Sequence, residues 1–315
     1  MAVELVTVGV VCADVMVRPV DSFPAWGALG VVPHLELHLG GLAAVTASVY
    51  SQLGGSAAFV GSIGTDSFGD FLVNALQQRG VDMSAVRRDP ANSSSATVVL
   101  ISSNGERTFL HHIGTNGQVV VDDIDFEMVS HAKVFHWGGP ALTPRLAGEP
   151  MARLFERARA AGVKTSMDTS FDGHGHWLPL IEPSLSQLDI IFSSLEEARH
   201  YTGKETPEDI ADFYRSYGVE TAVIKLGEHG LYLKSRDVAE HLPAHKVQVV
   251  DTTGAGDAAC GGFLYGYAHG WDPLRCGRLA NAVGGLTVQA MGGAEAITSL
   301  EATLAFMEQS QECYG

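Results

Sequence analysis

Cysteine and basic residues are both scarce in this sequence of 315 residues, and each shortage excludes a class of protein. No CxxC or Cys/His spacing of a zinc site occurs, so we expect buried thiols in a reducing compartment. The 20 lysines and arginines are outnumbered by 36 acidic residues, which gives a formal net charge of −16. Binding to nucleic acid needs clustered basic residues, so we expect no such partner. The cysteines are Cys12, Cys260, Cys276 and Cys313.

Long apolar runs are missing as well. No stretch approaches the roughly 18–20 residues that span a bilayer. The N-terminal segment MAVELVTVGVVCADV lacks the basic region and the cleavage site of a signal peptide, and it is typical of a first buried strand. We therefore expect a cytoplasmic protein without membrane contact. An apolar fraction of 46% and a charged fraction of 18% predict a globular chain with a substantial core.

Short apolar runs alternate with segments of helical spacing, and no repeat, low-complexity tract or polar linker interrupts them. Such alternation predicts an α/β fold in which helices flank a mainly parallel sheet. Strands are predicted at residues 5–11, 57–63, 133–139, 163–168, 188–193 and 221–227, and helices at 43–54, 68–80, 144–162 and 207–218.

Two stretches break the alternation. Residues 15–39 have strand-like character with proline and glycine interruptions, and residues 93–116 predict a hairpin that turns at Asn104-Gly105. Neither fits a helix that connects parallel strands, so we expect a small separate β-sheet that acts as a lid. The predicted core comprises residues 1–14, 40–92 and 117–315, and the predicted lid comprises 15–39 and 93–116.

The segment VVDTTGAGDAACGGFLYG predicts a junction between a strand and a helix, with glycines and one acid at the turn. The N–H groups of Gly254, Ala255 and Gly256, at the positive end of the helix, would form an anion hole. The same helix end should keep Asp257 ionised at neutral pH. An ionised carboxylate beside an anion hole suits phosphoryl transfer, because it takes a hydroxyl proton while the amides stabilise phosphoryl charge.

Other interpretations of this turn stay open at this point. The segment also satisfies a loose G-x-G-x-x-A pattern of nicotinamide dehydrogenases, although it lies near the C-terminus. A glycine turn that only allows close packing of a helix on a sheet is a further alternative. A P-loop is absent, because no G-x-x-x-x-G-K-[ST] occurs.

The junction resembles the C-terminal signature of the ribokinase-like (phosphofructokinase-B, or PfkB, type) carbohydrate kinases, with seven matching residues from Asp251 to Asp257. The resemblance covers nearly the whole chain in the family's order of motifs. It includes GVVCADVMVRP near the N-terminus, the glycine pair Gly40-Gly41, and NGERTFLHHIGTN. The segments VIKLGEHGLYL and LANAVGGLTVQAMGGA extend it toward the C-terminus.

This resemblance implies a Rossmann-like core with a β lid, and transfer of the γ-phosphoryl group of ATP to a hydroxyl of a sugar or similar molecule. It also implies Mg²⁺, a site for a monovalent cation such as K⁺, and a homodimer formed through the lid. By position, Asp257 is the implied general base and the turn Gly254, Ala255 and Gly256 the anion hole. The implied substrate contacts are Asp14, Gly40, Gly41, Val45 and Asp168. The implied nucleotide contacts are Ser194, Lys225, Gly227, Thr252, Gly254, Gly256 and Asn281. The implied metal contacts are Glu197 for Mg²⁺ through water, and Asp251 and Thr253 for the monovalent cation.

Three positions depart from the family pattern. Val45 replaces a substrate-contacting asparagine, Ser170 follows Asp168 where asparagine is common, and Ser194 replaces the asparagine of N-x-x-E. An apolar side chain cannot bind sugar hydroxyls, so the substrate is expected to present fewer of them near Val45. A nucleoside kinase of the same fold, or a ligand-binding protein with weak kinase activity, therefore stays open.

Histidines and one arginine are the remaining candidates. His174 and His176, the pair His111-His112, and His241 with His245 lack the spacing of a zinc site, so we expect none. The DGHGHW segment is expected to form a loop over the substrate or a surface turn. His112 is expected to face the sugar from the lid, and Arg107 is either a solvated charge or a ligand contact.

Overall fold

The structure, a computed structural model, describes residues 3–309, so Cys313 lies outside the described residues. Within this range, nine strands form one sheet, in which the second strand of the following order runs antiparallel to both of its neighbours and all other pairs are parallel. The order is β13 (Ala239–Leu242), β12 (Leu231–Lys234), β11 (Thr221–Lys225), β10 (Ile190–Ser194), β9 (Lys164–Asp168), β8 (Val134–Gly138), β1 (Leu5–Gly9), β4 (Ala57–Gly64) and β5 (Val86–Asp89). The predicted α/β class and the mainly parallel sheet are confirmed, whereas the antiparallel edge pair was not predicted.

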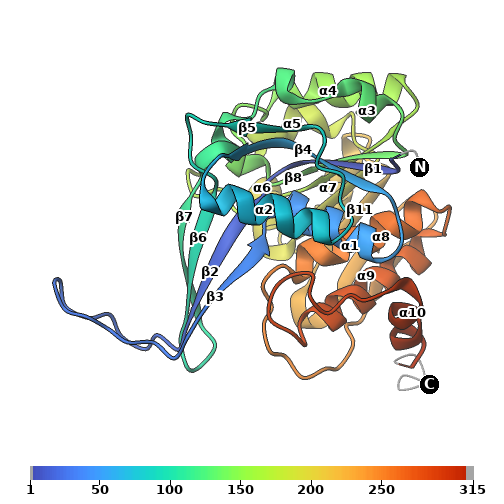
Figure 1. The fold of residues 1–315 in the computed structure, drawn as a ribbon. Helices are drawn as coiled ribbons and strands as arrows, with labels where there is room; N and C mark the ends of the chain where they lie inside the picture. The colour runs from blue at the N-terminus through green and yellow to red at the C-terminus, as the bar shows by residue number, and fades with distance from the viewer. Residues whose placement is uncertain (1–2, 310–315) are drawn as a thin grey trace.

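Helices cover both faces of this sheet, as Figure 1 shows. Alternation along each strand sends side chains to opposite faces. On β8, Val134 joins the apolar cluster of one face, whereas Phe135 joins that of the other. The first face is packed by α1 (Leu42–Gln52), α2 (Ser67–Gln78), α8 (Ala255–Ala268), α9 (Pro273–Thr287) and α10 (Leu300–Gln309). The second is packed by α3 (Phe126–Ser130), α4 (Glu149–Ala160), α5 (Leu178–Leu185), α6 (Leu195–Thr202) and α7 (Pro207–Ser216). Single turns of 3₁₀ helix lie at Gly114–Gln118, Val121–Asp123, Pro140–Leu142 and Gly227–His229.

A second, smaller sheet stands apart from the first and confirms the predicted separate sheet (Figure 1). Its order is β3 (His34–Gly40), β2 (Cys12–Arg18), β6 (Ala96–Ile101) and β7 (Arg107–His112), with β2 and β6 parallel and the other pairs antiparallel. The hairpin of β6 and β7 turns at Asn104-Gly105 as predicted, and Gly105 has a φ of +87°. Residues 19–33 between β2 and β3 project from this sheet.

One predicted strand is split in two. Residues 5–11 were expected to form a single strand, but β1 ends at Gly9 and β2 begins at Cys12 in the other sheet. Gly9 has a φ of +134°, and a Cβ there would lie 1.9 Å from the carbonyl oxygen of Gly138. The break carries Asp14 into the small sheet. Across residues 3–309, no helix combines the length and the apolar character needed to cross a bilayer.

Candidate active site

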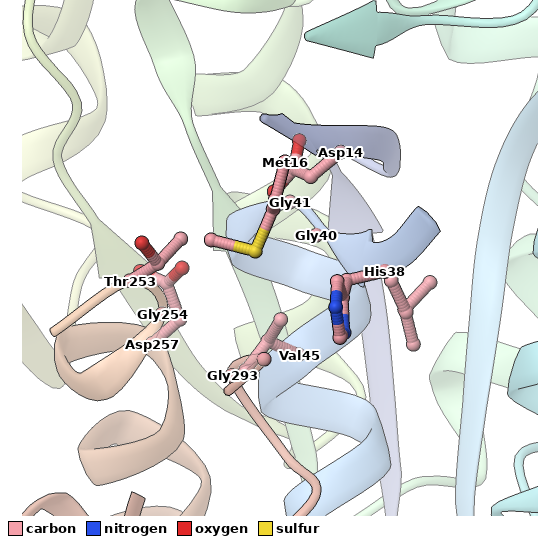
Figure 2. Close-up of a pocket in the computed structure, with 12 residues that line it drawn as sticks. Asp14, Met16, His38, Gly40, Gly41, Val45, Thr253, Gly254, Asp257 and Gly293 are labelled. Atoms are coloured by element: carbon pink, nitrogen blue, oxygen red, sulfur yellow. The ribbon is translucent and has the colours of Figure 1, made fainter. Parts of the chain in front are cut away.

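A pocket lies where the small sheet faces the first turn of α8 (Figure 2). Its walls come from β2, β3, α1, α8 and the segment before α10, so segments far apart in the sequence meet here. The lining residues are Asp14, Met16, His38, Leu39, Gly40, Gly41, Val45, Thr253, Gly254, Asp257, Gly292 and Gly293. The structure thus brings the predicted substrate contacts Asp14, Gly40, Gly41 and Val45 together with the predicted base.

Asp14 depends on the absence of a side chain at Gly40. The two residues lie on neighbouring strands, and a Cβ on Gly40 would lie 1.9 Å from Oδ2 of Asp14. Gly41 begins α1 with a φ of +99°, and a Cβ there would lie 2.5 Å from the carbonyl oxygen of Val10. Burial raises the pKa of Asp14 to about 6. The glycine pair therefore leaves room for the Asp14 carboxylate and lets the backbone at Gly40 and Gly41 form a wall of the pocket.

The turn before α8 is held by hydrogen bonds to Asp251. Oδ1 of this buried carboxylate accepts from the N–H and the hydroxyl of Thr253, at 3.0 and 2.7 Å. Its Oδ2 accepts from the N–H of Gly292 at 3.4 Å. Gly254 has a φ of +74°, and a Cβ there would lie 2.7 Å from Cα of Gly293. Asp251 thus fixes the two glycine segments that meet at the floor of the pocket.

Asp257 lies in the first turn of α8 and lines the pocket. Its carbonyl oxygen accepts a hydrogen bond from the hydroxyl of Thr46 on α1, at 3.0 Å. Desolvation by the surrounding protein, and then the charge of Asp168, raise the pKa of Asp257 to about 7. These surroundings oppose the ionisation that the helix end was expected to favour, so both the ionised and the protonated form of this residue are populated at neutral pH. Desolvation and a neighbouring acid outweigh the helix end.

Asp168 and Lys225 form a buried ion pair at the carboxyl edge of the sheet. The lysine ammonium donates to Oδ1 and Oδ2 of Asp168, at 2.7 and 2.8 Å. The thiol of Cys260 lies 3.4 Å from the same Oδ2. Neither Asp168 nor Lys225 is among the residues that line the pocket, although the sequence predicted contacts with substrate and nucleotide. The ammonium also lies beside the glycine turn, because a Cβ on Gly256 would be 3.2 Å from Nζ.

Glu197 and Ser194 cap α6 reciprocally. The Ser194 hydroxyl accepts from the N–H of Glu197 at 3.3 Å, and Oε2 of Glu197 accepts from the Ser194 N–H at 3.4 Å. The same Oε2 accepts from the hydroxyl of Thr169 at 2.9 Å. No group of three or more His, Cys, Asp or Glu residues is placed to hold a metal ion in the part of the chain that the structure describes.

The remaining predicted nucleotide contacts lie outside the lined pocket. Gly227 is exposed, and a Cβ there would meet nothing within 4 Å, so there is open space beside it. Thr252 is exposed at the turn before α8. The amide of Asn281 donates to the carbonyl oxygens of Leu242 and Pro243, both at 3.0 Å, and so ties α9 to the chain after β13.

The small sheet corrects the assignment of a pocket-facing histidine. In the strand register, His111 lies opposite Thr97, and Thr97 lies opposite Asp14. His112 lies opposite Ala96, and its ring forms a hydrogen bond with the Ser93 hydroxyl. Because side chains alternate along a strand, His112 points to the face away from Asp14. The histidine that lines the pocket is His38 on β3, directly opposite Asp14.

Arg107 contacts the glycine turn from the hairpin. Its Nη1 donates to the Thr253 hydroxyl at 2.8 Å and lies 3.8 Å from Oδ1 of Asp251. A purely solvated charge, one of its two interpretations, is therefore wrong. The DGHGHW segment forms a turn in which Asp172 accepts backbone N–H groups, with Trp177 stacked on His200, and none of its residues lines the pocket.

Sequence reasoning missed Met16, His38, Gly292 and Gly293 as parts of the pocket. The first two share a strand face with Asp14, so the period of two along residues 12–18 and 34–40 would have indicated them once the pairing was known. The last two lie in the segment LANAVGGLTVQAMGGA, whose resemblance to the family does not single them out.

Comparison with known proteins agrees with this fold. The sequence pattern of the family described as "pfkB family carbohydrate kinase" matches residues 4–300. An aminoimidazole riboside kinase from Salmonella typhimurium is 31% identical over 268 residues, which cover 82% of this chain and 84% of the relative. A probable chloroplastic fructokinase of Arabidopsis thaliana is 30% identical, covering 93% of this chain and 80% of the relative. The structure of an Arabidopsis thaliana ribokinase with ribose and ATP superposes with a TM-score of 0.84 at 26% identity, covering 98% of this chain and 99% of that one. The chain therefore belongs to the pfkB family of carbohydrate kinases.

Proposed function

We propose that this enzyme transfers the γ-phosphoryl group of ATP to a hydroxyl of a sugar or sugar-like molecule, with Asp257 as general base. The observation that carries the proposal is the position of Asp257, which lines one pocket with Asp14 and follows the Gly254–Gly256 turn directly. The relative whose structure contains ribose and ATP supports the same pair of ligands.

The proposed transfer takes place in one step. An oxygen of the acceptor hydroxyl attacks the γ-phosphorus and gives its proton to the carboxylate of Asp257. The bond between the γ-phosphorus and the bridging oxygen breaks, and its electron pair remains on ADP. The N–H groups of Gly254, Ala255 and Gly256 stabilise the charge on the transferred group, because two of the three residues lack a Cβ and let an oxygen approach the backbone closely.

Glu197 fits a role in holding Mg²⁺ through water. One of its carboxylate oxygens is used by Thr169 and Ser194, and the other accepts no hydrogen bond within residues 3–309. One carboxylate with water and phosphate oxygens is a usual set of Mg²⁺ ligands. Bound Mg²⁺ would neutralise charge on the phosphates. The hydroxyl of Ser194 is already used as the cap of α6, so we assign it contact with the nucleotide or its waters only.

The nucleotide is proposed to lie over the carboxyl ends of β10 and β11, between Gly227 and the α9 residue Asn281. Open space beside Gly227 supports this location. Carboxyl ends of strands are the usual ligand site in open α/β sheets. Thr252 completes the proposed contacts with the bound nucleotide, and Lys225 is proposed to contact its γ-phosphoryl end. Asp168 accepts hydrogen bonds from the ammonium of Lys225 and is proposed to reach the substrate through it.

A monovalent cation such as K⁺ is proposed beside Asp251 and Thr253. The carboxylate of Asp251 is buried, and it organises the turn that forms the anion hole. A cation there would strengthen the anion hole. Replacing K⁺ by tetramethylammonium in the assay should lower kcat/KM several-fold, and an unchanged rate would argue against the site.

A nucleoside or riboside is the second candidate for the acceptor. The relative with 31% identity is an aminoimidazole riboside kinase, and Val45 and Met16 give the pocket apolar side chains. Such side chains suit a base or a part of the substrate without hydroxyls better than a fully hydroxylated chain.

The proposal is tested by incubating the enzyme with Mg-ATP and a panel of ribose, fructose, sugar acids and nucleosides, followed by ³¹P NMR of the products. We expect one class of acceptor to yield a phosphomonoester in equal amount to ADP. A nucleoside monophosphate would select the second candidate. No phosphomonoester from any member would contradict the kinase assignment.

The small sheet is proposed to act as a lid over the pocket, with residues 15–39 and 93–116 as its extent, and to pair with a second copy of the chain. Its face away from Asp14 is apolar and open: Leu35 is 66% exposed and Leu110 60%. Val15 and Val98 share this face and are half-buried. An apolar face of this kind is typical of an interface. Sedimentation equilibrium should give a dimer for the natural chain and a monomer for Leu35→Lys/Leu110→Lys, whereas a monomeric natural chain would contradict the proposal.

We propose a cytoplasmic location for the protein. Cys12, Cys260 and Cys276 are free and buried, which suits a reducing compartment. Fractionation of cells that carry a tagged copy should place the protein with soluble cytoplasmic markers, and enrichment in another compartment would overturn the proposal.

A further inference from the structure

Lys225 has a position that nucleotide contact alone does not explain. It ends β11, and its side chain reaches across the end of β10 to Asp168 on β9. Only 17% of the lysine side chain is exposed, and none of the Asp168 side chain is. Two nearly equal hydrogen bonds, at 2.7 and 2.8 Å, fix the ammonium from one side. The lysine is therefore a cation held in place before any ligand arrives.

The fixed ammonium lies against the turn that forms the proposed anion hole. A Cβ on Gly256 would lie 3.2 Å from Nζ, 3.4 Å from Cδ and 3.6 Å from Cε, so the lysine fills the space that this glycine leaves. Asp168 is the one acceptor that Nζ binds within residues 3–309, and an ammonium has three protons. The ammonium of Lys225 can therefore donate one further hydrogen bond to an acceptor at the turn.

The charges around the turn show why a cation is needed there. Asp168, Asp257 and Glu197 all act on one another electrostatically, and Lys225 is the basic group that acts on both of the first two. Without it, the charged side chains that face Asp257 would all be carboxylates, since the other cation near the turn, Arg107, contacts Thr253 and Asp251 from the small sheet. Backbone N–H groups carry only partial positive charges.

We propose that Lys225 is a catalytic residue of the kinase reaction, whose ammonium binds an oxygen of the phosphoryl group during transfer, and that Asp168 is its positioning residue. The proposal rests on the proposed function and adds a charged member to the anion hole. Lys225 gives up no proton. It donates a hydrogen bond while the bond from the acceptor oxygen to phosphorus forms and the bond from phosphorus to the bridging oxygen of ADP breaks.

A purely structural role is the competing explanation, because removing one partner of a buried ion pair destabilises a fold. The double variant Asp168→Asn/Lys225→Met removes both charges and separates the two roles. Lys164→Met is the matched control. It breaks a similar pair with the buried Asp189, at 2.8 Å, at the opposite edge of the sheet, where β9 begins.

The test measures two quantities for the wild type, Lys225→Met, Lys225→Arg, the double variant and the control. The first is the affinity for Mg-ADP with and without fluoroaluminate, which mimics the transferred phosphoryl group, by isothermal titration calorimetry. The second is kcat and KM for whichever acceptor the panel identifies. Thermal unfolding of each variant shows whether it folds.

We expect Lys225→Met and the double variant to lose the gain in affinity from fluoroaluminate by a factor of about 100, with Mg-ADP affinity changed less than threefold. Their kcat should fall by about 100- to 1000-fold, as for loss of one donor to a developing charge. Lys225→Arg should restore part of both quantities, and the control should match the wild type. Because the first measurement needs no acceptor, a wild type that fails the panel but shows the fluoroaluminate gain would overturn the proposed function and not this proposal.

A double variant that folds and regains the wild-type fluoroaluminate gain would overturn the proposal and assign the pair a structural role. An equal loss of affinity for Mg-ADP with and without fluoroaluminate would also overturn it, since the lysine would then hold the nucleotide rather than the transferred group.

Discussion

Asp257 must be ionised to act as the proposed general base, but its surroundings oppose ionisation. Its pKa of about 7 is set first by desolvation and next by Asp168. The charged groups that face it are Asp14 from β2, Asp168 from β9, Glu197 from α6 and Lys225 from β11. A base is most effective when its pKa lies near the working pH, so this environment suits proton transfer at neutral pH.

The pH dependence of the reaction should reflect this residue. Only the ionised carboxylate accepts a proton, so kcat/KM for the acceptor should rise with pH through about 7 and level off above it. Initial rates between pH 5.5 and 9 would measure this. A flat profile over that range would show that no group of this pKa takes part.

The stability of Asp257→Asn should exceed that of the wild type at high pH. The folded-state pKa of about 7 lies above the ordinary value for aspartate, so between the two values the folded state binds more protons than the unfolded state. Stability of the wild type therefore falls as pH rises through this window, and asparagine removes that loss. Melting temperatures at pH 8 should favour the variant by a few degrees, with the difference shrinking toward pH 4. A difference independent of pH would contradict the assignment.

Gly40→Ala should impair acceptor binding. Its Cβ would overlap Oδ2 of Asp14 at 1.9 Å and displace the carboxylate. We expect KM for the acceptor to rise at least tenfold with KM for ATP unchanged, as measured by steady-state kinetics. Gly173→Ala is the control, because a Cβ there meets nothing within 4 Å. Equal effects of the two changes would contradict the role of Gly40.

At the scale of elements, the junction between strand and helix at α8 could be predicted from sequence, whereas the exact faces of the lid strands could not. The seven residues Asp251 to Asp257 indicate the turn by themselves. The choice between His111 and His112 depends on which residue pairs with Thr97, which is a partner on another strand. Likewise, the break after Gly9 depends on Gly138, a neighbour that only the folded sheet supplies.

The contact between the β7 hairpin and the turn before α8 gives a prediction at this scale. Arg107 donates to Thr253, so Arg107→Ala should loosen the small sheet over the pocket. We expect a higher KM for the acceptor and faster acceptor-independent hydrolysis of ATP, since an open lid admits water. Arg153→Ala is the control, because this arginine side chain is exposed on the outer side of α4. Unchanged hydrolysis would show that the contact does not close the pocket.

For the whole molecule, the alternating pattern of the sequence predicted the layers because the strands between the two edge strands of the large sheet are buried. Two apolar clusters, one on each face, account for that alternation. The alternating pattern could not predict which residues line the pocket. They come from β2 and β3, α1, α8 and the Gly292-Gly293 segment, which meet only in the folded chain. The value of the Asp257 pKa is likewise a property of the assembled site, since it depends on acids from other elements.

The most direct test of the account is acceptor-dependent release of ADP by the wild type and by Asp257→Asn, compared at saturating Mg-ATP and pH 8. General base catalysis contributes about 100- to 10,000-fold, so the variant should lose at least that lower factor in kcat while it still binds ATP with the wild-type affinity. A variant that releases ADP as fast as the wild type would contradict the assignment of Asp257 as the base.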